Sequence, residues 1–178
     1  MRIARRLLLT VTLAVAVFST AALAQEGKGD VVYVPTPQVA VDEMLKMAKV
    51  SANDFVIDLG SGDGRILITA AKKLGARGLG VDLDTVLLKR ARDGAQREGV
   101  ADRVQFVEQN LFETDLSRAT VITTYLLPEM NEKLRPRLQK ELRKGTRVVS
   151  NSFTMGEAWP PEKVQVVENS SIYFWTIK

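Results

Sequence analysis

The stretch Val56-Ile57-Asp58-Leu59-Gly60-Ser61-Gly62-Asp63-Gly64-Arg65 decides the fold of this chain. An apolar run ends at an acidic residue, and three glycines then stand at every second position before a helical segment. Glycine is needed where the backbone adopts a positive φ or presses against a ligand. At the carboxyl end of a first strand, such a loop is where open α/β sheets hold nucleotide-like ligands. The stretch therefore predicts an α/β protein with such a ligand.

Three classes of nucleotide-like ligand compete for this loop, beside an ordinary glycine-rich turn that binds nothing. A dinucleotide site requires G-x-G-x-x-G, whereas the spacing here is G-x-G-x-G, followed by Arg65 and Ile66. A phosphate-cradling P-loop requires a Gly-Lys-Ser/Thr ending, which the loop lacks. The D-x-G-x-G-x-G loop of S-adenosylmethionine-dependent methyltransferases fits residues 58–64 without a gap.

The charge around the loop favours S-adenosyl-L-methionine. Asp58 and Asp63 flank the loop, and Asp82 and Asp84 follow on the next strand. A pyrophosphate would meet like charge there, at about 1 kcal/mol or more per close pair. S-adenosylmethionine carries a positive sulfonium and a positive ammonium, which suit acidic residues beside free backbone N–H groups. The residues expected to bind it are Asp58, Gly60, Ser61, Gly62, Asp63 and Gly64.

A second acidic residue supports this interpretation. Asp82 closes the short apolar run of residues 78–81, 24 positions after Asp58. A nucleotide ribose is typically held by an acidic residue about 20 residues beyond the glycines, at the end of the second strand. The alternative role for Asp82 is a helix N-terminal cap, but Asp84 or Thr85 can fill that role instead. We therefore expect the Asp82 carboxylate to accept from both ribose hydroxyls.

Together these residues resemble the class I methyltransferases. More narrowly, Tyr33-Val34-Pro35-Thr36-Pro37, then residues 58–65, then Thr124-Tyr125-Leu126-Leu127-Pro128, resemble small single-domain protein-lysine methyltransferases. These are the broad-specificity archaeal enzymes and their relatives that modify the mitochondrial ATP synthase c-subunit. The resemblance covers about residues 30–178. The chain departs from the family pattern at Asn151, which follows Ser150 at a position where many relatives have His. No role of that His is therefore carried over to this chain.

The resemblance also implies further site residues. Asn110, after the third strand, matches by place the residue that takes the adenine amino group, and Leu111 and Phe112 could sandwich the ring. Tyr125 could line the acceptor channel at the end of the fourth strand, or it could only pack there. The additional cofactor-binding residues that the resemblance implies are Tyr33, Thr36 and Leu83.

The expected activity is in-line methyl transfer to a lysine side chain of a protein substrate. Only the neutral amine is nucleophilic, and the free lysine pKa is ≈ 10.4, so the acceptor must first lose a proton. The chain has no His, so the catalytic candidates near the fourth strand are Tyr125 and Glu129, beside water. Two alternatives stay open: methylation of a small molecule, and binding of S-adenosylmethionine or a nucleoside without turnover.

Composition restricts the chemistry of this 178-residue chain. With 46% apolar and 26% charged residues it reads as an ordinary globular protein. The absence of Cys and His excludes disulfides, thiolate metal sites, histidine metal clusters and histidine bases, and no metal is expected. Removal of residues 1–24 would lower the net charge from +4 to +1. Such a near-neutral charge does not indicate binding to nucleic acid. A monomer is expected.

The first 24 residues are typical of a secretory signal peptide. A basic start with Arg5-Arg6 precedes the apolar residues 7–18, and Ala22-Leu23-Ala24 is a small-x-small cleavage pattern. The alternative is an uncleaved membrane anchor, because residues 7–24 are barely long enough for a span. We expect cleavage after Ala24, a linker over 25–30, a methyltransferase domain over 31–178, and a periplasmic or extracellular protein without stable membrane contact.

The order of the remaining segments predicts a single-domain, doubly wound, seven-stranded sheet that is mostly parallel. Strands that alternate with helices give a parallel sheet covered on both faces. The last two strands are too close in sequence for a helical crossover, so they form an antiparallel hairpin around Asn169-Ser170. Thr36 is expected to cap a helix that starts at Pro37, and Pro136 to interrupt the last helix. The expected strands are 55–59, 78–82, 103–108, 120–125, 146–152, 163–167 and 171–177, and the other expected helices are 65–74, 85–98 and a segment ending at 144.

Overall fold

The computed structural model describes residues 33–178, so the predicted signal peptide and linker lie outside the described residues. A seven-stranded sheet has the order β3-β2-β1-β4-β5-β7-β6. Strands β1 to β5 are parallel, and β7 is antiparallel to both β5 and β6. The strands are β1 (Phe55–Leu59), β2 (Arg77–Asp82), β3 (Val104–Glu108), β4 (Val121–Thr124), β5 (Arg147–Asn151), β6 (Lys163–Val167) and β7 (Ser170–Thr176).

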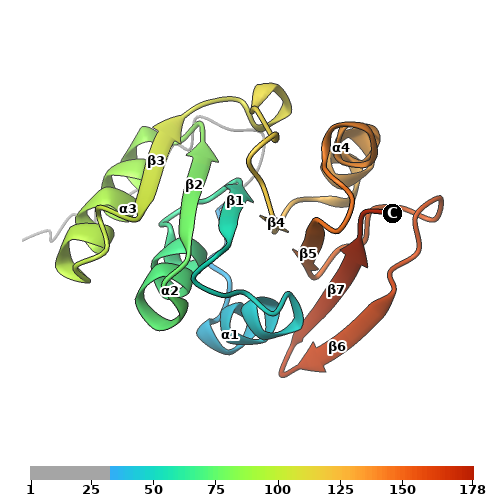
Figure 1. Cartoon of the computed structure of the whole chain (residues 1–178), viewed down its shortest axis with the longest axis horizontal. Coiled ribbons are helices and arrows are strands. Elements are labelled where there is room, and N and C mark those ends of the chain that lie inside the picture. Colours follow the sequence, from blue (N-terminus) through green and yellow to red (C-terminus); the bar gives the residue numbers. More distant parts are fainter. Residues whose placement is uncertain (1–32) are drawn as a thin grey trace, which may run out of the picture.

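Helices cover both faces of the sheet, as the alternating pattern predicts (Figure 1). Three helices pack on one face and α4 packs on the other. Alternate residues of each central strand supply the two cores: Val56 and Val121 face the three helices, and Ile57 and Ile122 face α4. The helices are α1 (Gln38–Met47), α2 (Arg65–Leu74), α3 (Thr85–Arg97) and α4 (Pro128–Glu141), with a 3₁₀ turn η1 (Leu111–Glu113).

The predicted fold class is confirmed, and each strand lies within one residue of its predicted bounds. The predicted bounds of α2 are those found, because Gly64 and Gly75 on either side of it both have left-handed backbones. Within residues 33–178, none of the helices is long and apolar enough to cross a bilayer.

Two local predictions about the helices are wrong. Thr36 does not cap α1: the helix begins at Gln38, and Pro37 occupies the N-cap position without a side-chain cap. The cause is the ψ of Pro37, 144°, which keeps that residue extended. Pro136 does not interrupt α4 either, although proline removes one helical hydrogen bond. It lies on the exposed side of the helix, where water can hydrate the freed carbonyl, while Leu134 and Leu138 stay buried against the sheet.

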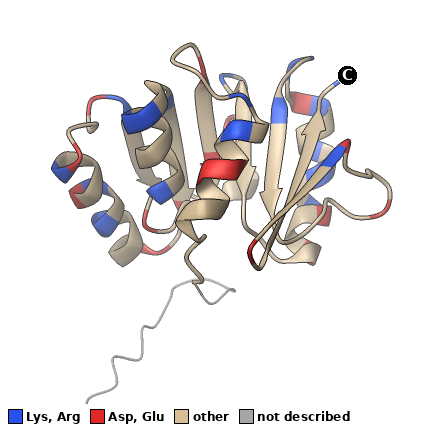
Figure 2. Cartoon of the chain, turned by 90° about the horizontal axis from the view of Figure 1, so that it is seen from below, with Lys and Arg blue, Asp and Glu red and all other residues tan. Residues whose placement is uncertain are grey.

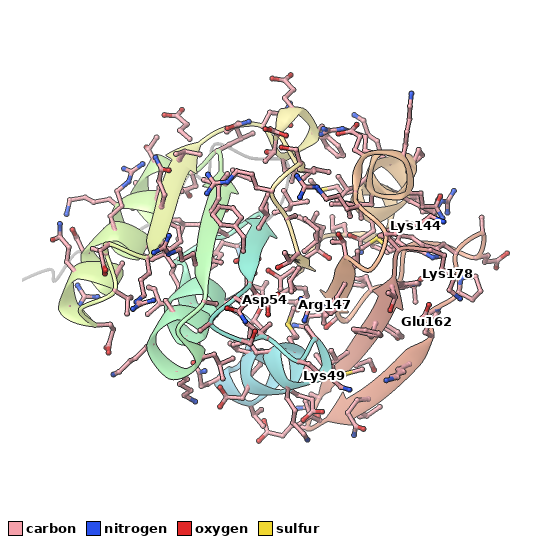
Figure 3. All side chains as sticks on the ribbon, in the orientation of Figure 1. Lys49, Asp54, Lys144, Arg147, Glu162 and Lys178 are labelled. Atoms are coloured by element: carbon pink, nitrogen blue, oxygen red, sulfur yellow. The ribbon has the colours of Figure 1, made fainter. Side chains whose placement is uncertain are left out.

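An ion pair between a buried carboxylate and a partly exposed guanidinium links the amino ends of the parallel strands. Asp54, just before β1, pairs with the guanidinium of Arg147 at the start of β5, and Figure 3 shows the two side chains next to each other. The same Asp54 carboxylate accepts from Thr120 Oγ1 at 2.8 Å and from the Ser51 N–H at 2.8 Å. Arg147 also donates to the carbonyl of Ala48, at 2.6 Å. This network lies at the edge of the sheet opposite the glycine loop, so it contributes to stability rather than to the site.

Candidate active site

The carboxyl ends of β1 to β5 meet at one edge of the sheet, because these strands are parallel. The loop after β1 carries the three glycines, and the loop after β2 begins at Asp82. The η1 turn follows β3, and Tyr125 follows β4. The chain therefore brings the predicted site residues of four separate segments to a single edge.

The glycine loop is held in a tight, left-handed conformation. Gly62 has a φ of +52° and Gly64 a φ of +77°, values that residues other than glycine rarely adopt. A Cβ at Gly64 would also lie 2.5 Å from Phe106 Cζ. A Cβ at Gly62 would lie 2.5 Å from the Tyr33 ring, so that ring rests directly on the loop. These glycines are required for close packing as well as for backbone shape.

The backbone N–H groups of the loop are not free, contrary to the sequence-based expectation. Those of Gly60 and Ser61 both donate to the Val81 carbonyl, at 3.0 and 2.9 Å. The Gly62 N–H donates to Asp82 Oδ2 at 2.8 Å, and the Gly64 N–H donates to the Ser61 carbonyl at 2.9 Å. A pyrophosphate site depends on unpaired N–H groups at the loop and the helix start. These four bonds therefore weigh against a phosphate ligand and in favour of recognition by carboxylates.

Asp58 is the most deeply buried carboxylate of the loop, with 2% of its surface exposed. Its Oδ1 accepts from Thr123 Oγ1 at 2.7 Å, whereas its Oδ2 has no hydrogen-bond partner among the described residues. Burial raises the pKa of Asp58 to about 7, the Thr123 hydrogen bond opposes the shift, and the charges of Asp82 and Asp63 add to it. A buried acceptor without a partner is costly. It is therefore suited to a cationic group such as the S-adenosylmethionine ammonium.

Asp82 is oriented by two backbone donors. Its Oδ2 accepts from Gly62, and its Oδ1 accepts from the Asp84 N–H at 3.0 Å. Asp84 caps α3 by accepting from the N–H groups of Val86 and Leu87. The alternative role of Asp82 as the helix cap is therefore filled by its neighbour. Each Asp82 oxygen keeps a lone pair for a ligand hydroxyl.

The Asp63 carboxylate forms an ion pair with a nearby arginine of the same chain. The Arg65 guanidinium donates to both its carboxylate oxygens, at 2.9 Å to Oδ1 and 2.6 Å to Oδ2. Although burial works to raise it, the pKa of Asp63 lies below its ordinary value because of these bonds. Arg65 also donates to the Thr36 carbonyl at 2.8 Å, which ties the segment before α1 to the loop. Burial and the Asp63 charge raise the pKa of Tyr33, which covers Gly62, to about 12.

The remaining predicted residues lie around the same edge. Leu83 follows Asp82 and has 44% of its surface exposed. Asn110 caps η1, its Oδ1 accepting from the Phe112 N–H at 3.0 Å, and Leu111 beside it is partly buried. The assignment of Asn110 to the adenine amino group stays a prediction. That contact would use the second lone pair of Asn110 Oδ1, because the first accepts from the Phe112 N–H.

Two aromatic rings lie at the ends of β4 and β5. Tyr125 stacks on Phe153, with ring centroids 6.3 Å apart and the planes 27° from parallel. Phe153 reaches this position through a tight turn in which Ser152 has a φ of +63°. Glu129 lies exposed in the first turn of α4. Phe153 was not among the residues that the sequence singled out, because its place depends on this turn.

Asn131 is a second residue that sequence reasoning missed. It is fully buried in α4, and its Nδ2 lies within 3.4 Å of the carbonyls of Leu126 and Phe153, and 3.2 Å from that of Thr154. It thus joins the loops after β4 and β5. A signal was present: Asn131 lies on the same helical stripe as Leu134 and Leu138, where a polar residue needs a partner.

The comparisons with known proteins agree with this geometry. The sequence model of the ANTKMT methyltransferase domain matches residues 58–163. A protein-lysine N-methyltransferase of Saccharolobus islandicus is 45% identical over 150 residues, which are 82% of this chain and 92% of that protein. The chain belongs to this family of class I, S-adenosylmethionine-dependent methyltransferases.

Two further relatives bear on the substrate. The lysine N-methyltransferase of the ATP synthase c-subunit from Xenopus laevis is 36% identical over 74% of this chain, which spans 57% of that protein. A crystal structure of an RNA methyltransferase from Salinibacter ruber, in complex with S-adenosyl-L-homocysteine, is 52% identical. It has a TM-score of 0.79 and covers 81% of this chain and 94% of that one. The cofactor of this methyltransferase is S-adenosylmethionine, and the loop carboxylates fit its positive charge.

The ionisation of Asp58 should make cofactor binding depend on pH. Because a cationic amino group prefers the ionised carboxylate, affinity should rise with pH through the Asp58 pKa of about 7. We expect the dissociation constant of S-adenosylhomocysteine, measured by calorimetry, to fall about tenfold between pH 6 and pH 8.

Replacing Asp58 with Asn should flatten this pH profile, because the amide does not titrate. The matched control is Asp93→Asn on the solvent-facing side of α3, where the carboxylate pairs with Lys89. A flat profile in the parent protein would contradict the assignment of Asp58 to the amino group.

Proposed function

We propose that this chain methylates lysine side chains of proteins, with S-adenosylmethionine as the methyl donor. The observation that carries the proposal is its 45% identity, over nearly the whole length of that relative, to a protein-lysine N-methyltransferase. The match to the ANTKMT domain and the similarity to the Xenopus laevis enzyme support the same acceptor class.

The cofactor, when bound, supplies an electrophilic methyl group on a positively charged sulfur. Asp58 would hold its amino group and Asp82 its ribose hydroxyls, while Asn110 and Leu111 would hold the adenine. These groups lie at the ends of β1, β2 and β3, so they place the donor along the carboxyl edge of the sheet. Fixing donor and acceptor in line can lower a reaction barrier by ≈ 7–11 kcal/mol.

The acceptor amine would enter beside the paired rings of Tyr125 and Phe153. Partial burial against these rings and the nearby positive sulfur would lower the lysine pKa, which favours the nucleophilic amine. The chain contains no His. The Tyr125 hydroxyl is therefore proposed to accept a hydrogen bond from the incoming ammonium, whose proton passes through water to the Glu129 carboxylate at the exposed start of α4.

RNA is the second candidate acceptor, because the 52% identical structure is that of an RNA methyltransferase. Charge argues against it. Residues 33–178 hold 21 Lys and Arg against 19 Asp and Glu, a net charge of only +2. Figure 2 shows both signs interspersed over the helices. RNA binding typically uses a surface in which positive charge is concentrated.

The deciding experiment supplies each candidate acceptor separately. The purified protein is incubated with methyl-labelled S-adenosylmethionine and, in parallel, with a protein extract, total RNA, and a small-molecule fraction of the same cells. Label on lysine in the protein arm, mapped by mass spectrometry, supports the proposal. Label confined to RNA or to small molecules would refute it, and binding without transfer in every arm would indicate a non-catalytic protein.

Variants of Tyr125 would locate the acceptor channel. Tyr125→Ala removes both the ring and the hydroxyl, whereas Tyr125→Phe keeps the stack with Phe153 and removes only the hydroxyl. A loss of transfer in both variants, with cofactor binding intact, supports the proton-transfer role. Full activity of Tyr125→Phe would leave the ring as a channel wall only.

We also propose that residues 1–24 direct export of the chain. Support comes from the basic start, the apolar run of residues 7–18 and the Ala22-Leu23-Ala24 cleavage pattern. Amino-terminal sequencing of the protein recovered from the periplasm or the medium should begin at Gln25. Recovery of the intact chain from the cytosol alone would contradict export.

A further inference from the structure

The α4 helix holds loops on both of its flanks. On one flank, Arg135 donates to the Met155 carbonyl at 2.9 Å, in the loop after β5. On the other, Arg137 reaches the η1 turn, which follows β3. Leu134 and Leu138 lie between the flanks, buried against the sheet. Leucines recur every fourth position, at 134, 138 and 142, which predicts a solvated face for the charged residues between them. These two arginines nevertheless donate to backbone carbonyls.

Arg137 makes the larger set of bonds. Its guanidinium donates to the carbonyl of Phe112 and, at 2.9 Å, to that of Thr114. The remaining N–H groups bind the Glu141 carboxylate in a two-pronged pair, at 2.8 and 2.6 Å. This pair orients the guanidinium, because two parallel bonds fix the plane of both groups. Lys133, one turn earlier on the same flank, lies over the Phe112 ring at 4.5 Å.

The η1 turn depends on such an anchor. It is three residues long, and β3 before it is the edge strand of the sheet, bonded only to β2. The carbonyls at the end of a short 3₁₀ turn have no helical partners. Arg137 supplies those partners from a helix that is itself packed on the sheet. The position of Asn110 and Leu111 is therefore set from α4 as well as from β3.

We propose that Arg137 is a positioning residue for the adenine end of the cofactor. It touches no ligand itself and acts by holding the turn that presents Asn110 and Leu111 to the purine. Arg135, on the opposite flank, holds only the loop after β5 and has no such effect. This inference rests on the proposed placement of adenine at Asn110.

The test compares Arg137→Met with the matched control Arg135→Met. Both remove an arginine that donates to a loop from the same helix, so both are expected to lower the melting temperature. Calorimetry with S-adenosylhomocysteine should show affinity about tenfold weaker for Arg137→Met, the loss expected when one hydrogen bond to the purine fails to form. The Arg135→Met variant should bind within about twofold of the parent.

A second ligand separates positioning from general loosening. S-inosylhomocysteine lacks the adenine amino group, and the parent should prefer the adenosyl compound about tenfold. The preference should fall below about threefold in Arg137→Met and stay intact in Arg135→Met. Equal affinities and equal preferences in the two variants would overturn the proposal.

Asn110→Ala separates the positioning role of Arg137 from the assignment of Asn110 to adenine. If this variant keeps the full preference for adenosine while Arg137→Met still weakens binding tenfold, the assignment of Asn110 is wrong and Arg137 acts on another contact of the turn. If neither variant changes binding, the adenine does not lie at η1. If Arg137→Met alone has no effect, the positioning role is refuted and the site assignment stands.

Discussion

Replacing Asp82 with Ala is expected to weaken cofactor binding about 100-fold, or about 2.7 kcal/mol. The carboxylate has two functions that both fail in this variant. It is the acceptor proposed for the ribose hydroxyls, and charged acceptors make hydrogen bonds roughly twice as strong as neutral ones. It also accepts hydrogen bonds from the N–H groups of Gly62 and Asp84. Its removal leaves the Gly62 N–H without this acceptor, so the middle of the glycine loop is no longer held in place.

Calorimetric titration with S-adenosylhomocysteine measures this loss directly, without any acceptor. Asp82→Asn separates the two functions, since the amide keeps one oxygen acceptor and should lose less affinity than the alanine variant. Asp93→Ala on α3, the helix that follows Asp82, is the matched control, because its carboxylate pairs with Lys89 at the surface. Binding of Asp82→Ala within threefold of the parent would show that the ribose lies elsewhere.

The fold was largely readable from the sequence because it depends on short, local patterns. Buried parallel strands appear as apolar runs, and the runs ending at Asp58 and Asp82 are β1 and β2. The close spacing of the last two strands permits only an antiparallel hairpin. The turn of that hairpin lies one residue earlier than expected, at Glu168 and Asn169, because β7 already begins at Ser170.

The partners within the site were less readable, because a sequence pattern shows which residues are apolar but not which atoms meet. The glycines of the loop could be found, but the engagement of their N–H groups by Val81 and Asp82 depends on how close β2 comes to the loop. Likewise, the spacing of Arg135 and Arg137 is compatible with a solvated helix face. Their use as anchors depends on loops that are distant in sequence.

The ion pair at the other edge of the sheet provides the second large effect. Arg147→Met is expected to lower the free energy of unfolding by about 3 kcal/mol, because removing one partner of a buried pair leaves an uncompensated charge. That charge is Asp54, whose side chain is 7% exposed. The variant also removes the donor to the carbonyls of Ala48 and Lys49. Urea unfolding at pH 7.5 measures the loss.

The pH dependence identifies the buried carboxylate as the cause. Burial works to raise the pKa of Asp54, but hydrogen bonds from Thr120, Ser51 and Arg147 hold it below its ordinary value. A carboxylate with a lowered pKa stabilises the fold above its unfolded pKa of about 3.9, and this contribution is lost as the pH falls through the folded value. In Arg147→Met the carboxylate becomes protonated at a higher pH, so the difference from the parent should shrink as the pH is lowered from 7.5 to 4.

The matched control is Lys144→Met, which removes an exposed positive charge in the segment between α4 and β5, apart from the Asp54–Arg147 pair (Figure 3). It should change the free energy of unfolding by less than about 0.5 kcal/mol at either pH. Asp54→Asn combined with Arg147→Met removes the uncompensated charge and should recover part of the loss at pH 7.5. If the double variant were as unstable as Arg147→Met alone, the loss would come from the freed carbonyls of Ala48 and Lys49 rather than from the buried charge.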